Sequence, residues 1–241
     1  MEQTPEKETR DAREMTLIGH LSELRRRIIV AVVAIVIGTL VAYFYVDELM
    51  RFVTAPAGKL YFMSPAEGFF AYLKLAVFAG FMLALPVVLW EIWAFVAPAL
   101  TTHEKQWAVI MVPGAALLFF IGEAFAYLLV WPAAVKFFLG FGSESLQPML
   151  SLGQYLSFLL SFILPFGVIF NLPLLLLVLA KIGIISSGFL AKQRRIMILL
   201  AFIIGGIITP TPDIFTQTMM AIPIILLYEA SIWAVKILLR K

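Results

Sequence analysis

The chain has 241 residues, of which 62% are hydrophobic and only 14% are charged. Soluble globular domains carry about 25% charged residues, so this composition excludes an ordinary soluble protein and indicates a polytopic membrane protein of one compact unit. The sequence contains no cysteine, which excludes disulfides, thiolate metal ligands and cysteine nucleophiles. The basic residues are spread over several short loops, and this distribution argues against a nucleic-acid-binding surface.

A polar tail precedes the apolar part of the chain. Residues 1–14 have no large apolar side chain after the initiator methionine, so they cannot bury enough surface to offset the entropy of ordering. We therefore predict a disordered tail over residues 1–15 and a single transmembrane domain over residues 16–241. At the start of that domain, apolar residues recur at helical spacing as far as Ile28. This pattern predicts a short amphipathic helix at the surface before the chain turns into the membrane.

Six apolar runs can cross a membrane. The first has about 19 uncharged residues, which is enough for a hydrocarbon core of about 30 Å, and a signal peptide is disfavoured because further spans follow. The last two runs offer only about 13 and 14 residues, so these helices must thin the bilayer or lie beside longer ones. Prolines should break the second span at Pro86 and kink the fourth at Pro165 and Pro173. The six predicted spans are Ile28–Val46, Phe69–Phe95, Ala108–Val130, Tyr155–Ala180, Ile196–Ile208 and Phe215–Tyr228.

The basic residues predict the orientation of the chain. An even number of spans places both termini on one side, and every Lys and Arg except Arg51, Lys59, Lys74 and Lys136 falls on that side. The positive-inside rule therefore predicts that both termini are cytoplasmic. No inverted repeat is visible, which weakens a secondary-transporter interpretation. No phosphate loop, HExxH or GxSxG motif is present, so we predict no enzyme, no cofactor and no metal site.

The polar interruption from Phe95 to Lys105 places one carboxylate, Glu104, where the chain leaves the membrane on the cytoplasmic side. Pro98 should end the preceding helix, because it lacks a backbone donor and biases the residue before it away from helix. A threonine can cap the next helix, with Glu104 in its first turn. This arrangement has a purely structural interpretation as a capped loop between two membrane helices.

A second carboxylate, Glu23, is predicted near the same boundary. Each of the two carboxylates can accept a bidentate guanidinium, so Glu23 and Glu104 together would suit a ligand with adjacent arginines. The structural alternative for Glu23 is an ion pair with Arg26 or Arg27 at helical spacing, which is worth only a few tenths of a kcal/mol.

Other polar residues are predicted at membrane depth. Glu123 lies within the third span, where a charge costs at least about 2.5 kcal/mol, so it should face a protein groove or water, or be protonated. Asn171 can use its amide to bond a carbonyl that Pro173 leaves free. Glu91 and Glu229 lie nearer the cytoplasmic boundary and can reach water.

The segment His20-Leu21-Ser22-Glu23-Leu24-Arg25-Arg26-Arg27 resembles the amino-terminal signature of the TatC family, the core subunit of the twin-arginine protein translocase. Five further segments match motifs of the same family. Each motif alone is weak evidence, but all six occur in the family's order over about residues 15–240. The further matching segments are Phe95-x-x-Pro98-x-Leu100-x-x-x-Glu104-Lys105, Phe125-Ala126-Tyr127, Phe166-Gly167, Pro212-Asp213 with Gln217, and Ala221-Ile222-Pro223 before Tyr228-Glu229.

The resemblance implies an all-α membrane protein, a cup-shaped bundle of six transmembrane helices in the cytoplasmic membrane. It implies a receptor for twin-arginine signal peptides that exports folded proteins with the proton gradient, in contact with TatA, TatB, membrane lipid and further copies of itself. Pro56 matches a proline of the family's first outer loop, and Asp213 and Gln217 match polar positions near the contact with TatA and TatB. The residues carried over to signal-peptide binding are Glu104, Phe95, Glu23, Arg25, Pro98 and Leu100.

One position departs from the family pattern. The family often has a glutamate where this chain has Asn171, and we hypothesise that Glu123 supplies the membrane-embedded acid instead. The residues leave two alternatives open. A proton-coupled small-solute transporter could use Glu123 and Glu229 as a relay, and a purely structural scaffold would explain the lack of catalytic motifs.

Overall fold

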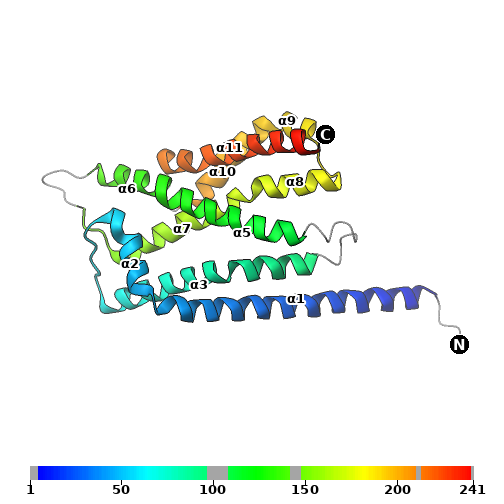
Figure 1. Ribbon diagram of the computed structural model, residues 1–241, viewed down its shortest axis with the longest axis horizontal. Helices are drawn as coiled ribbons and strands as arrows, with labels where there is room; N and C mark the ends of the chain where they lie inside the picture. Colours follow the sequence, from blue (N-terminus) through cyan, green and yellow to red (C-terminus); the bar gives the residue numbers. More distant parts are fainter. Residues whose placement is uncertain (1–4, 97–107, 142–147, 210–212, 240–241) are drawn as a thin grey trace. The chain divides into compact units, whose positions relative to one another are not determined.

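The protein is almost entirely helical. The computed structural model describes residues 5–96, 108–141, 148–209 and 213–239, and these are helices and turns apart from an isolated β-bridge between Tyr61 and Ser151 (Figure 1). The chain is therefore a multi-pass all-α membrane protein, as predicted. Within the described residues, five helical segments are long and apolar enough to cross a membrane: Gly19–Tyr43, Pro65–Val96, Met111–Leu139, Leu152–Ile182 and Ile214–Ile237.

The helices form two compact units. One unit contains residues 1–45 and 76–113, and the other contains residues 46–75 and 114–241. Helix α3 (Pro65–Val96) contributes its first turns to the second unit and its remainder to the first.

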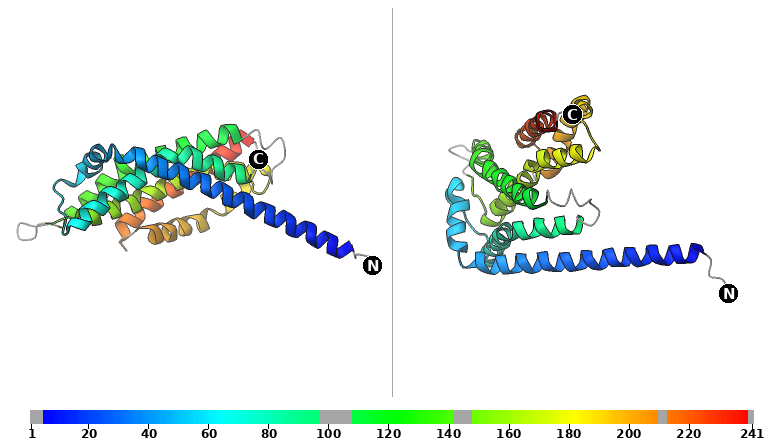
Figure 2. Two further views of the ribbon diagram at one scale, coloured as in Figure 1. Left: turned by 90° about the horizontal axis from the view of Figure 1, so that it is seen from below. Right: turned by 45° about the vertical axis from the view of Figure 1, so that its right-hand side comes forward.

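In the first unit, helix α1 (Pro5–Tyr43) runs without a break, and Figure 2 shows it as one straight rod. This corrects the predicted surface helix that turns into the membrane near Ile28. The helix begins at Pro5, so its backbone also extends into the segment for which the sequence predicts a tail. No proline follows Pro5 within α1, so the polar turns and the apolar run continue in one helix.

Small residues bring α1 and α3 close together. A Cβ atom built on Gly38 would lie 2.4 Å from the Gly80 carbonyl oxygen, and one built on Gly80 would lie 2.3 Å from the Thr39 nitrogen. Contact of this kind is typical of helix packing in membranes, where small side chains let backbones approach. The predicted break at Pro86 is not present, since α3 continues through it.

The second unit begins with a helix that the sequence analysis missed. Residues 47–68 lie between the first two predicted spans, and no helix was predicted there, but the chain forms α2 (Val46–Thr54) and a short 3₁₀ turn at Ala55–Ala57. Helix α2 has acidic residues in its first turn and Arg51 in its last, as the helix dipole favours, and it buries Val46 and Met50.

The third span was predicted to end at Val130, just before Trp131-Pro132, but the chain remains helical beyond this point. Helix α5 (Ala108–Phe125) passes through a π-helical turn (Ala126–Val130) into α6 (Trp131–Leu139). Pro132 lies in the first turn of α6, where the absence of a backbone donor costs least, and the π-helical turn supplies the change in hydrogen bonding.

The fourth span is divided beside Pro173, one of the two prolines at which a kink was predicted. Helix α7 (Leu152–Phe170) contains Pro165 and ends at Asn171, and α8 (Leu172–Ile182) begins with Pro173 in its first turn. A short helix, α9 (Ser187–Lys192), leads to the last two helices.

The last pair differs from the prediction in one respect. Helix α10 (Arg194–Ile208) is short, with 15 residues, but α11 (Ile214–Leu239) has 26 residues and continues through Glu229. The predicted length of α11 is therefore corrected: the charge ended the apolar run without ending the helix, since Ile232 and Val235 beyond it are buried. Their cluster joins α11 to α8 and α9, which lie beside it in Figure 1.

Candidate functional site

A cluster of charges joins α1 to α3 in the first unit. Arg27 Nη1 donates to Glu91 Oε2 at 3.0 Å, and Arg27 Nη2 donates to Glu23 Oε1 at 3.3 Å. The side chains of Arg27, Glu23 and Glu91 are 31%, 33% and 12% exposed, respectively. Glu23 and Arg27 are four residues apart and share a face of α1, while Glu91 reaches them from the antiparallel helix.

Two aromatic rings lie beside these charges. His20 and Phe95 stack with their ring centroids 4.4 Å apart and an interplanar angle of 21°. Phe95 is four residues after Glu91, so both side chains lie on the face of α3 that meets α1. We name the group of His20, Glu23, Arg27, Glu91 and Phe95 the α1–α3 patch.

The patch contains some of the predicted binding residues. It brings Glu23 and Phe95 together, whereas Arg25 is exposed and lies about 200° around the helix from Glu23 and Arg27. Glu104, Pro98 and Leu100 lie outside the described residues. The alternative interpretation of Glu23 as the partner of Arg27 is confirmed as a contact, but that contact is shared with Glu91.

Glu91 was missed as a site residue, because the sequence analysis expected it to reach water. Its side chain is instead the most buried of the three and pairs with a residue 64 positions away. Only the antiparallel pairing of α1 with α3, which is a tertiary feature, would have connected Glu91 with Arg27.

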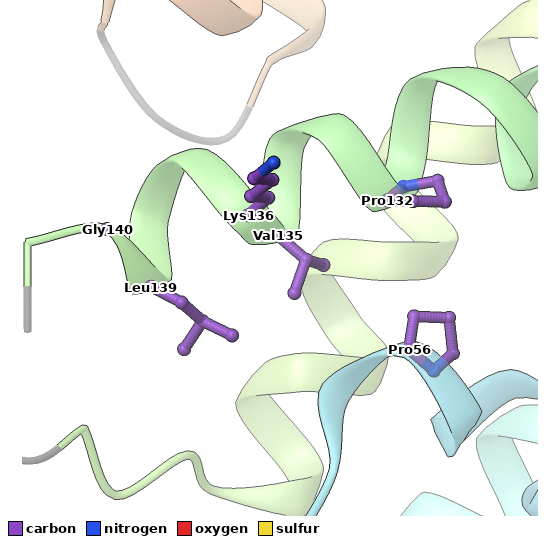
Figure 3. A pocket seen from close by; sticks show the side chains of 6 residues that line it. All are labelled: Pro56, Pro132, Val135, Lys136, Leu139 and Gly140. Atoms are coloured by element: carbon purple, nitrogen blue, oxygen red, sulfur yellow. The ribbon is translucent and has the colours of Figure 1, made fainter.

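In the second unit, Pro56 faces helix α6. It borders a cavity of about 470 Å³ together with Pro132, Val135, Lys136, Leu139 and Gly140. Figure 3 shows the Pro56 ring across from Pro132 and Val135. The proline that matches the family's outer loop therefore lies against the end of the third span.

Asp213 and Gln217 both have structural partners near the start of α11. Asp213 accepts hydrogen bonds from the Thr216 backbone nitrogen at 2.8 Å and from Thr216 Oγ1 at 2.6 Å, which is the geometry of an N-cap. Gln217 Nε2 donates to the Phe202 carbonyl of α10 at 2.8 Å. This bond fastens the short helix α10 to α11.

Glu123 and Asn171 are the two polar residues at depth in the second unit. Glu123 is 8% exposed, and its Oε1 has no hydrogen-bond partner among the residues that the structure describes. Asn171 Nδ2 donates to the Gly167 carbonyl at 2.8 Å, while no described group bonds its buried Oδ1. The carbonyl that Pro173 leaves without its usual partner is that of Ile169, four residues before it. The prediction that the Asn171 amide bonds this freed carbonyl is therefore wrong, since the amide bonds Gly167 instead.

Glu229 is held in an ion pair on the second unit. Arg194 Nε donates to Glu229 Oε2 at 3.0 Å, and Arg194 Nη2 donates to Glu229 Oε1 at 2.5 Å. This fork joins the first residue of α10 to the middle of α11. A proton relay that uses Glu229 would first have to break both of its hydrogen bonds with Arg194.

Glu67 is a second residue that the sequence analysis missed. Its carboxylate accepts hydrogen bonds from the Met63 nitrogen at 2.7 Å, from the Gly153 nitrogen at 2.8 Å and from Ser151 Oγ. The Glu67 nitrogen in turn bonds Ser64 Oγ. The signal was available, since Ser64-x-x-Glu67 has the spacing of a capping box, and here the carboxylate also binds the start of α7.

The sequence model of the family described as Sec-independent protein translocase protein (TatC) matches residues 19–223. The chain belongs to the TatC family.

Relatives in this family are similar along nearly their whole length. The TatC protein of Carboxydothermus hydrogenoformans is 44% identical over 94% of this chain and 95% of its own. That of Aquifex aeolicus is 41% identical over 94% and 97%. The Escherichia coli K12 protein is 35% identical over 90% and 86%.

The fold agrees with a solved TatC structure. A crystal structure of a twin-arginine translocase receptor, TatC, is 40% identical in sequence and matches with a TM-score of 0.78, covering 90% of this chain and 98% of that one. Sequence and fold therefore agree in placing this chain in the TatC family. The α1–α3 patch lies within the segment matched to the family, and Glu229 lies beyond it.

Proposed function

We propose that this TatC-family protein is the receptor for twin-arginine signal peptides and the core subunit of a translocase that exports folded proteins. One observation carries the proposal: in the α1–α3 patch the carboxylate of Glu23 is one-third exposed, and the ring of Phe95 stacks on His20 in the same patch. Carboxylates bind guanidinium with two hydrogen bonds, and an aromatic face adds a cation–π contact. The solved relative described as a twin-arginine translocase receptor supports the same function.

Glu104 completes the proposed site. It follows Phe95 by only nine residues, so the length of the chain between them allows its carboxylate to lie near the patch. Glu104 would bind one arginine of the peptide and the patch the other. Pro98 and Leu100 would shape the loop, and Arg25 would support the site from the exposed face of α1.

The proposed orientation puts the patch in the cytoplasm. It lies just before the apolar part of α1, and Arg25 and Arg26 are exposed beside it, as expected at a cytoplasmic boundary. With α10 counted as a sixth, short span, both termini lie in the cytoplasm and the protein lies in the inner membrane.

The partners of the translocase would bind the second unit. TatA and TatB are proposed to contact the polar start of α11 at Asp213 and Gln217 and the surface around Pro56, and TatC would also associate with further copies of itself and with lipid. Export would be driven by the proton gradient. Helix α10 has 15 residues, or about 22 Å, so a partner helix beside it meets a locally strained bilayer.

Binding of a labelled peptide tests the receptor function. In purified protein, Glu104→Ala should abolish binding of a synthetic twin-arginine signal peptide, because one of its guanidinium groups loses its carboxylate. A twin-lysine peptide should bind the wild type more weakly, since lysine cannot make the two-point contact. Equal binding by the variant and the wild type would refute the assignment of Glu104, provided that the variant inserts and folds normally.

A transport assay tests the hypothesis that Glu123 is the membrane-embedded acid. Glu123→Ala should reduce export of a folded reporter by about tenfold or more if the carboxylate meets the peptide or a partner within the membrane. Asn171→Ala should have a smaller effect, because its amide bonds the Gly167 carbonyl of its own helix. Normal export by Glu123→Ala with failure of Asn171→Ala would reverse the two roles.

A small-solute transporter remains the second candidate, with Glu123 and Glu229 as its relay. Solute uptake into vesicles that contain this chain alone would favour it. The family membership and the ion pair of Glu229 with Arg194 both weigh against it.

A further inference from the structure

We infer that Arg27 is a built-in competitor for the arginine of the signal peptide, and that Glu91 is the positioning residue that holds Arg27 aside when the peptide binds. The inference rests on the proposed receptor function and names the exchange by which the site opens. In the free protein Arg27 occupies Glu23. When the peptide arrives, its guanidinium takes Glu23 while Arg27 stays on Glu91.

The two contacts of Arg27 are unequal in strength. The contact with Glu91 measures 3.0 Å and reaches a side chain that is 12% exposed, whereas that with Glu23 measures 3.3 Å and reaches one that is 33% exposed. A partly exposed ion pair four residues apart on one helix contributes little to stability. The bond to Glu23 is therefore the one that an external guanidinium can replace.

The bonding of Arg27 is also incomplete. Each carboxylate receives one nitrogen of the guanidinium, so neither has the fork geometry that makes arginine–carboxylate pairs strong. The buried Nε of Arg27 has no hydrogen-bond partner in the described part of the chain. A peptide arginine that binds Glu23 through both oxygens would exchange a single-point contact for a two-point contact.

The net charge of the cluster is negative and therefore favours the binding of a second cation. Two carboxylates face one guanidinium, and the neighbouring Arg25 and Arg26 are exposed on other sides of α1. A second guanidinium makes the group neutral. The ring of Phe95, stacked on His20 at the edge of the cluster, offers a flat surface for that guanidinium.

Opposite effects are expected for the two single variants. Arg27→Gln removes the competitor and should tighten binding of a labelled twin-arginine peptide by about three- to tenfold. Glu91→Gln leaves Arg27 with Glu23 alone, so it should weaken binding by a similar factor. In the double variant the competitor is absent and Glu91 is not needed, so binding should return at least to the wild-type level.

Matched controls separate this exchange from changes in net charge and from structural damage. Arg26→Gln removes the same charge one residue away, from an exposed position, and should not tighten binding. Glu48→Gln removes an exposed carboxylate on α2 and should not weaken it. Thermal unfolding in detergent reports whether each variant folds.

The outcomes are distinct. If wild-type protein does not prefer the twin-arginine over the twin-lysine peptide, the proposed receptor function fails. If it does, but Arg27→Gln weakens binding in folded protein, or the double variant is weaker than Glu91→Gln, Arg27 and Glu91 are only structural and the exchange is refuted. Tightening by Arg27→Gln, loss with Glu91→Gln and recovery in the double variant support it.

Discussion

At the scale of single residues, some polar groups of this TatC-family protein have hydrogen-bond or ion-pair partners, and others keep a buried atom without one. Asp213, Gln217 and Glu229 are bonded within their own unit. Glu123 keeps a buried oxygen with no described partner, and Arg27 keeps such a nitrogen. Leaving a covered polar atom without a hydrogen bond is unfavourable, so positions of this kind are candidates for contact with a ligand.

Glu67 accepts hydrogen bonds from two backbone nitrogens and a hydroxyl, and its removal should therefore destabilise the protein. In Glu67→Ala the nitrogens of Met63 and Gly153 and the hydroxyl of Ser151 lose their acceptor. We expect the free energy of unfolding to fall, because these donors lose their hydrogen bonds to a charged acceptor, and chemical or thermal unfolding in detergent measures the loss. Glu48→Ala, which removes an exposed carboxylate on α2, is the control. An equal effect of both substitutions would contradict the structural role of Glu67.

At the scale of helices, α1 and α3 depend on a close approach through two glycines. The patch requires this approach, because Arg27 and Glu91 can pair only if the helices lie side by side. The predicted break at Pro86 would have interrupted the helix that carries Glu91, but α3 continues to Val96.

Gly80→Ala should therefore disturb both packing and peptide binding. Its Cβ would lie 2.3 Å from the Thr39 nitrogen, which is backbone and cannot rotate away. We expect a loss of about 1–3 kcal/mol of stability from overpacking, with weaker binding of a twin-arginine peptide. Gly114→Ala, whose Cβ meets open space, should be neutral or stabilising. If Gly80→Ala binds and unfolds like the wild type, the close approach is not needed.

At the scale of the whole molecule, the sequence was enough to predict the class of fold and the family. Runs of uncharged residues predicted the spans, and ordered motifs predicted the TatC resemblance. Both signals are local, because they depend on composition and spacing along the chain. The short α10 and the division of the fourth span beside Pro173 were predicted for the same reason.

The sequence analysis was wrong where tertiary packing decides. It ended a helix at Pro132 and shortened α11 at Glu229, although Val135 and Val235 beyond these points are buried. It also missed α2, since a loop rich in proline and glycine gives little helical signal. For the site, Glu23 and Phe95 came from motifs, but Glu91 could be found only from the packing of α3 on α1.

The pairing of Arg27 with Glu91 also has a consequence for biogenesis. The two residues are separated by 64 positions, so at about 5–20 residues per second the ribosome adds Glu91 several seconds after Arg27. During that interval the nascent α1 has only Glu23 as a nearby counter-charge on its own helix. We expect the proposed peptide-binding site to form only after α3 has been inserted beside α1, so that unfinished chains cannot bind cargo.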